Sequence, residues 1–109
     1  MARLADDRLP DGVLVIDGGV IVEANRRARQ LLGRPDPVGE PAQQRLDPRN
    51  DAGLEVTIPT TPPAVGHRHP ERILHVAVSG GRRPLACTAG WDGSSLVVTL
   101  RHAGRREAA

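Results

Sequence analysis

Two short apolar runs joined by a glycine pair constrain the fold of this 109-residue chain more than any other feature. Val13–Ile16 and Val20–Val22 are rich in β-branched residues, and Asp17, Gly18 and Gly19 between them tolerate the positive φ of a tight turn. Two such runs separated by Asp-Gly-Gly predict a β-hairpin. Because Val13–Ile16 is apolar without interruption, we expect this strand to be covered on both faces.

A short helix is predicted directly after the hairpin. Asn25 is a good N-cap, because its side chain can accept hydrogen bonds from the free amides of a first helical turn. An apolar stripe follows at positions i, i+3 and i+4, formed by Ala28, Leu31 and Leu32. Gly33, with a proline two residues later, ends the helix. This hairpin and its capped helix are the best-specified part of the sequence.

The middle of the chain carries weaker signals, because prolines break long elements there. Five of them lie between residues 47 and 70, and they leave the conformation of that stretch unassigned. One helical turn is predicted over residues 42–46. Apolar and polar residues alternate over Leu54–Ile58, which favours a short, half-buried strand.

The last third of the chain predicts an antiparallel meander. Its three strands are expected at Ile73–Val78, Leu85–Ala89 and Leu96–Leu100, with turns at Ser79–Arg82 and Trp91–Ser94. Together with the hairpin they make five strands. The simplest closed arrangement is an α+β fold, in which one five-stranded antiparallel sheet carries short helices on one face.

Composition limits what such a fold can do. The apolar fraction of 39% comes almost wholly from aliphatic residues, and Trp91 is the only aromatic residue. A net charge of +2 and the lack of aromatic stacking platforms argue against nucleic-acid binding. Every basic residue is arginine, which excludes lysine chemistry such as Schiff bases. The single cysteine, Cys87, suits a reducing compartment, and the apolar runs are too short to span a membrane, so we expect a cytoplasmic protein.

Several segments resemble PAS domains. The opening of the chain is similar to theirs in its strand pair, its helix-capping Asn and its Leu-Gly helix end, carried by Leu9–Asp17, Gly19–Val22, Ala24–Asn25, Ala28 and Leu31–Gly33. Val38–Pro41 resembles the Val-Gly-x-Pro turn of that family, and Leu96–Arg101 followed by Arg105–Glu107 resembles its last strand and signalling linker. The resemblance implies an N-terminal extension over residues 1–8, a PAS-like domain with its five-stranded sheet over 9–102, and a linker or tail over 103–109.

The resemblance also implies a function. Such a chain would be a sensory and dimerisation domain of a cytoplasmic bacterial signal-transduction protein, not an enzyme. It would form a homodimer and relay ligand or partner binding to an attached or partner output domain, such as a kinase or transcription module. Its pocket would lie between sheet and helices, lined by Val15, Ile21, Leu31, Leu32, Leu46, Val76 and Val98. Without Phe or Tyr for stacking, we expect no cofactor, and either a small apolar ligand or none.

Two other functions are compatible with the residues. One is a ligand-free structural interaction domain with a filled core. The other is metal binding by His67, His69 and His75, since histidines at i and i+2 face the same way on an extended strand. No carboxylate or cysteine completes that set at a convincing spacing. Catalysis is not predicted, because the serines lie in turns without a nucleophile-elbow sequence and Cys87 is expected to be a small core residue.

Overall fold

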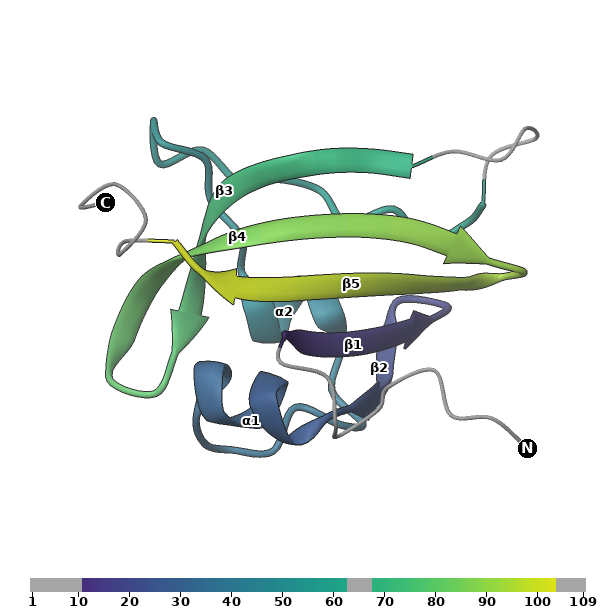
Figure 1. Cartoon of the computed structure of the whole chain (residues 1–109), viewed down its shortest axis with the longest axis horizontal. Coiled ribbons are helices and arrows are strands. Elements are labelled where there is room, and N and C mark those ends of the chain that lie inside the picture. Colours follow the sequence, from purple (N-terminus) through teal and green to yellow (C-terminus); the bar gives the residue numbers. More distant parts are fainter. Residues whose placement is uncertain (1–10, 63–67, 104–109) are drawn as a thin grey trace.

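The computed structural model describes residues 11–62 and 68–103. These residues contain five antiparallel strands and two short helices (Figure 1). The strands form one sheet in the order β2-β1-β5-β4-β3. The α+β fold predicted from the sequence is therefore confirmed. In chain order the elements are β1 (Gly12–Asp17), β2 (Val20–Ala24), α1 (Arg26–Leu32), α2 (Ala42–Leu46), β3 (Arg68–Val78), β4 (Gly81–Asp92) and β5 (Ser95–His102).

β1 joins the two halves of the chain. It pairs with β2 on one side and with β5, the last strand, on the other. Figure 1 shows the purple and yellow strands side by side in the middle of the sheet. Residues 12–16 of β1 are buried or nearly so, because neighbouring strands flank both edges and side chains cover both faces. This explains why the sequence of β1 is apolar without alternation.

Side-chain alternation divides the core into two clusters. Leu14 and Ile16 of β1 face the helices and pack in the main cluster with residues of α1, α2 and the other strands. Val13 and Val15 point to the opposite face, where Val97 of β5 packs against them. Residues of both helices belong to the main cluster, so both helices cover the same face of the sheet. Val13 and Val15 face away from the helices because successive side chains of a strand project to opposite faces.

Asn25 fixes where α1 starts relative to β1. Its side chain is 1% exposed, and its Oδ1 accepts hydrogen bonds from the backbone N–H groups of Ala28 and Val13, both at 2.9 Å. Its Nδ2 donates to the carbonyl of Asp11 at 3.0 Å. The predicted N-cap is confirmed, and the same side chain also replaces a ladder partner for the start of β1.

Gly33 ends α1 in close contact with the β3–β4 turn. Its φ of 76° is in the left-handed region, and its N–H donates to the carbonyl of Arg29 at 2.8 Å. A Cβ at this position would lie 2.5 Å from the Cβ of Ser79, whose own N–H donates to Leu32. Both the backbone angle and the space therefore require glycine here.

The predicted strand over Leu54–Ile58 is wrong. Glu55 alone makes a strand-type bridge, with Arg49, and the side chain of Leu54 is 64% exposed. The backbone groups that would pair with another strand are instead bonded to the side chain of Gln43 in α2. Pro59 follows the stretch directly and has no N–H to donate to a neighbouring strand.

Trp91 also differs from its prediction. It lies within β4 opposite Leu96 and packs against the core, whereas the turn between β4 and β5 contains only Gly93 and Ser94. Strands β4 and β5 are longer than their apolar runs indicate, since paired strands extend through polar residues until the turn. The predicted helical turn over residues 42–46 is confirmed as α2.

No helix in residues 11–62 and 68–103 is long and apolar enough to cross a lipid bilayer. The predicted extension over residues 1–8 and nearly all of the predicted tail over 103–109 lie outside the described residues.

Candidate functional site

An apolar cavity of about 190 Å³ lies between the inner face of the sheet and the segment that follows α2. It is larger than the engineered cavity of about 150 Å³ that binds benzene in another protein, so it has room for a small organic molecule. The strands and helix supply mostly aliphatic side chains to its wall: Leu46, Leu74, Val76, Cys87, Ala89, Leu96, Val98 and Leu100. The irregular segment over residues 47–59 supplies the facing wall with Pro48, Val56, Thr57, Ile58 and Pro59.

The cavity exists because small residues face it from the middle of the sheet. Cys87 and Ala89 alternate on the inner face of β4, where two larger side chains would fill the space. α2 has five residues and covers only part of the sheet. The sequence contains no Phe or Tyr, whose larger side chains could fill the space between the sheet and residues 47–59.

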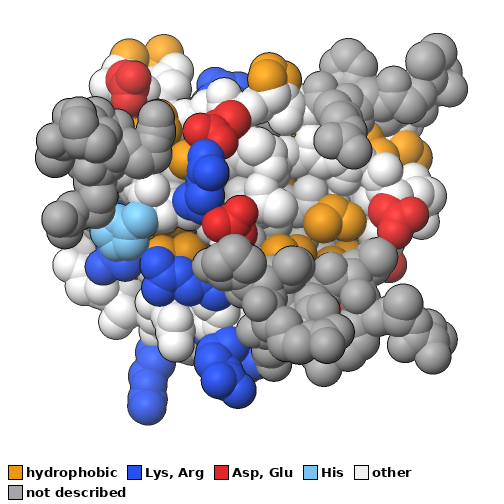
Figure 2. Space-filling model, viewed as in Figure 1, with side chains coloured by type: hydrophobic (Ala, Val, Ile, Leu, Met, Phe, Trp, Pro, Cys, Tyr) orange, Lys and Arg blue, Asp and Glu red, His pale blue; other side chains and the backbone are white. Residues whose placement is uncertain are grey.

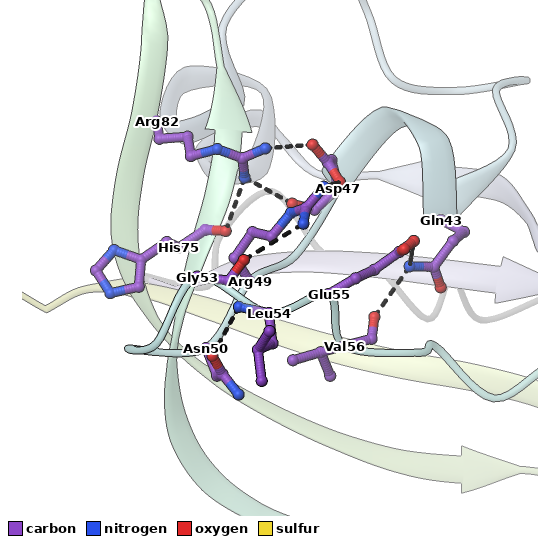
Figure 3. Close-up of polar contacts among 10 residues, drawn as sticks. All are labelled: Gln43, Asp47, Arg49, Asn50, Gly53, Leu54, Glu55, Val56, His75 and Arg82. Atoms are coloured by element: carbon purple, nitrogen blue, oxygen red, sulfur yellow. Dashed lines mark hydrogen bonds and ion pairs between the residues drawn. The ribbon is translucent and has the colours of Figure 1, made fainter.

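The side chain of Gln43 holds one end of the cavity wall. Its Nε2 donates to the carbonyl of Val56 at 2.9 Å and to Glu55 Oε2 at 3.0 Å (Figure 3). Its Oε1 accepts from the N–H of Ile58 at 2.7 Å. One amide thus binds a donor and an acceptor of the same segment, as a neighbouring strand would. This keeps Val56 and Ile58 in place against the cavity.

An ion-pair cluster holds the other end of the wall. Asp47, the left-handed C-cap of α2 with φ 41°, forms ion pairs with Arg82 of β4 and with Arg49 (Figure 3). Arg82 also donates to the carbonyls of Asp47, at 2.7 Å, and His75, at 3.2 Å. The hydrogen bond from Arg82 lowers the pKa of Asp47 despite partial burial of the carboxylate, and the charge of Arg49 adds to the effect.

Backbone bonds reinforce this attachment. The N–H of Arg49 donates to the carbonyl of His75 at 2.9 Å, and the N–H of His75 donates to the carbonyl of Arg49 at 2.8 Å. β3 is an edge strand, so its outer side offers these groups. The segment is therefore fixed at two points, at Arg49 by β3 and at Val56 and Ile58 by Gln43. The residues that face the cavity, Pro48 and 56–59, lie at or next to these two points.

The mouth of the cavity is positively charged. His69, Pro70 and Arg72 of β3 line it, and none of the lining residues is acidic. Arg72 is exposed, and its side chain has no hydrogen bond or ion pair with any residue that the structure describes. Its neighbour Glu71 pairs instead with Arg101 of β5.

Cys87 contributes an unreactive thiol to the cavity. Burial raises the pKa of this thiol to about 12, and the charge of Arg72 opposes the rise only in part. A thiol with such a pKa is protonated near neutral pH and is a poor nucleophile. Its position in the core agrees with the prediction of a small core residue.

Three of the seven predicted pocket residues, Leu46, Val76 and Val98, line the cavity. The other inward-facing ones, Ile21, Leu31 and Leu32, are buried in the main core cluster but do not reach it.

The placement of Val15 in the pocket is corrected by the alternation of β1, which directs it to the opposite face. Sequence reasoning also missed the wall over residues 47–59 and the small residues of β4. The alternation of Leu85, Cys87 and Ala89 was the available signal for β4, because it puts all three on the face that covers the core.

The three histidines do not come together in the described structure. His69 lies at the cavity mouth, whereas His75 Nε2 lies 3.0 Å from Asp51 Oδ1. His67 falls outside the described residues. Across residues 11–62 and 68–103, no group of three or more His, Cys, Asp or Glu side chains is arranged to hold a metal ion.

Charged side chains are mixed on the face that Figure 2 presents. Acidic and basic groups lie next to one another in its middle, with hydrophobic groups between them. Several basic side chains gather toward its lower left, the region that α1 and the β3–β4 turn occupy in Figure 1.

A family model described as a PAS domain matches residues 7–61. The match covers half of the chain and includes β1, β2, both helices and the segment that closes the cavity. The chain belongs to the PAS domain family. No curated protein matches it. β3, β4 and β5 lie beyond the matched residues, yet they complete the sheet of this PAS domain. β5 pairs with β1, β4 pairs with β5, and β3 pairs with β4. PAS domains are typically sensory or interaction modules.

Proposed function

We propose that this PAS domain senses a small apolar or amphiphilic molecule in a cytoplasmic bacterial signalling protein. In this proposal the domain forms a homodimer and relays binding to an attached or partner output domain, such as a kinase or transcription module. The observation that carries the proposal is the apolar cavity of about 190 Å³ between the sheet and residues 47–59. A purely structural interaction domain has no need for such a space, and an unfilled cavity lowers stability.

The proposal assigns no catalytic role to the domain. The cavity wall includes one thiol, that of Cys87, and burial raises its pKa to about 12. A protonated thiol lacks the nucleophilicity that covalent catalysis requires. The attachment of the cavity wall supports a sensing role instead, because polar contacts at two points can respond when a molecule enters beneath the segment.

Native mass spectrometry of the protein purified from its own host tests both parts of the proposal. We expect the mass of a dimer and a retained small molecule that denaturation releases. The mass of a monomer would contradict the proposed dimer. If no small molecule is retained, ligand sensing is decided by the binding titration with the cavity-filling variant described next.

A cavity-filling variant tests whether the cavity is the binding site. Ala89→Leu adds bulk inside the cavity, and Ala52→Leu adds the same bulk on an exposed turn. Titration with 1-hexanol should show saturable binding to the wild type and Ala52→Leu and none to Ala89→Leu. Equal binding to all three proteins, or to none of them, would contradict the proposed sensing site.

A further inference from the structure

The chemistry of the cavity mouth narrows the class of ligand. The interior is aliphatic, whereas the mouth carries the guanidinium of Arg72 beside His69. Neither Asp nor Glu lines the cavity in the described part of the chain. A molecule that fills the interior therefore places its outer end next to a positive charge.

Arg72 is available for a ligand in a way that other arginines around the cavity are not. Arg49 and Arg82 are paired with Asp47, and Arg45 donates to the carbonyls of Gly33 and Pro35. The acidic neighbour of Arg72 in the sequence forms its own ion pair across the sheet with β5. The side chain of Arg72 forms no hydrogen bond or ion pair with any residue that the structure describes.

The register of the sheet directs Arg72 toward the cavity. Arg72 lies opposite Cys87, and antiparallel partners project to the same face. Leu74 and Val76 follow it on β3 at alternate positions, and all four residues line the cavity. The charge of Arg72 reaches the buried thiol of Cys87, where it opposes the rise in pKa that burial causes.

We infer that the cavity takes a short aliphatic carboxylate, with its hydrocarbon tail between the sheet and residues 47–59 and its carboxylate at Arg72. This inference rests on the ligand-sensing function proposed above and specifies the ligand class. A guanidinium binds a carboxylate through two parallel hydrogen bonds, which suits a head group held at a rim. The aliphatic wall suits an alkyl tail better than a flat ring, since it offers no stacking partner other than Trp91, which does not line the cavity.

Paired titrations with hexanoate and 1-hexanol test this assignment, because the two molecules share a chain length and differ in head-group charge. Both should bind the wild-type chain. Arg72→Gln should lower the affinity for hexanoate about tenfold and change the affinity for 1-hexanol less than twofold. Because Arg72 is exposed, raising the salt concentration should lower the affinity for hexanoate but not the affinity for 1-hexanol.

Arg34→Gln is the matched control, since it removes one exposed positive charge that does not line the cavity. It should leave the affinities for both molecules unchanged. Urea unfolding of each variant checks that the fold is intact, and Arg72→Lys, which keeps the charge, should recover part of the hexanoate affinity.

Each outcome separates the two proposals. Binding of 1-hexanol without binding of hexanoate, or equal loss of both in Arg72→Gln, overturns the carboxylate assignment and leaves ligand sensing standing. Equal hexanoate affinity in Arg72→Gln and the wild type overturns it as well. Failure of both molecules to bind the wild type contradicts ligand sensing at this cavity and the carboxylate assignment with it.

Discussion

The hairpin with α1 and the segment over residues 47–59 contact the same sheet in different ways. In the first region, buried side chains and close backbone contacts leave no space, as a Cβ on Gly12 would lie 2.9 Å from the Cα of Ala28. In the second region, a largely irregular backbone spans a cavity and is fixed by polar side chains at its ends. The first region is therefore closely packed, whereas the second leaves a space beneath it, where we propose that a ligand binds.

The difference has a physical origin in the backbone hydrogen bonds. In the hairpin and α1 they are satisfied by ladders, helix turns and one buried side chain, so that opening any one exposes several groups. In the segment over residues 47–59, several are satisfied by the exposed or half-buried side chains of Gln43 and Asn50. Such contacts are individually weak in water. Local opening of the segment should therefore need less free energy than opening of the hairpin.

The largest expected effect comes from Asn25, the buried N-cap of α1, and its comparison is Asn50, whose side chain accepts backbone hydrogen bonds in a surface turn. Asn25→Ala should lower the free energy of unfolding by about 2–4 kcal/mol, because it removes the cap of α1 and leaves the N–H of Val13 buried without a partner. Asn50→Ala removes a side chain that accepts from Ala52 and Leu54 at the surface, and should cost at most about 1 kcal/mol. Urea denaturation measures both. Equal losses of unfolding free energy would contradict the difference between the closely packed hairpin with α1 and the segment over residues 47–59.

A second pair of variants tests how the cavity wall is held. Gln43→Ala should cost about 1–2 kcal/mol and speed hydrogen exchange at the Ile58 amide, because it removes the bonds to Val56 and Ile58. Gln44→Ala is the control, as its side chain is exposed on the same helix. Hydrogen exchange followed by NMR measures the Ile58 amide near Gln43 separately from the Arg49 amide at the other end of the wall. Unchanged exchange at Ile58 would show that Gln43 does not hold the segment.

A smaller effect is expected from pH at the other end of the wall. The hydrogen bond from Arg82 lowers the pKa of Asp47 in the folded protein, so the stabilisation is present above its unfolded pKa of about 4 and is lost as the pH falls through the folded value. Asp47→Asn keeps a residue that tolerates the left-handed backbone but lacks the charge. The difference in stability between the two proteins should shrink from pH 7 to pH 3. A constant difference would exclude the carboxylate charge as its cause.

A last comparison concerns the thiol inside the cavity. Burial raises the pKa of Cys87 to about 12, so the folded protein should react with a thiol reagent at pH 8 more than tenfold slower than the protein in urea. Hexanoate in the cavity should slow the reaction further, because it covers the sulfur. Labelling at the rate of an exposed cysteine would show that the wall over residues 47–59 opens freely.

Much of the fold could be predicted because its signals are local. The Asp-Gly-Gly turn, the Asn25 cap and the Gly33 end each depend on backbone angles or bonds within a few residues, and the structure contains all three. The predicted strand over Leu54–Ile58 failed because a side chain from α2 took the place of a strand partner. Local alternation carries no information about which distant group will supply a hydrogen bond.

The candidate site was predictable only in part for the same reason. Leu46, Val76 and Val98 could be assigned because each lies on the apolar side of its element. Val15 could not be placed from an apolar run in which inward and outward residues are alike, and its pairing with β5 and β2 fixes its direction.

Signals along the chain were enough to predict the hairpin, the capped helix, the meander and an aliphatic core. The packing of distant elements was needed to show that β1 and β5 are neighbours and that residues 47–59 cover a cavity. It was also needed to show that the side chain of Arg72 has no partner at the mouth of this cavity among the described residues. The two sets of features differ in the sequence separation of the residues that form them. Turns and caps are set by the angles and bonds of adjacent residues, whereas a cavity is the volume left over when distant elements pack.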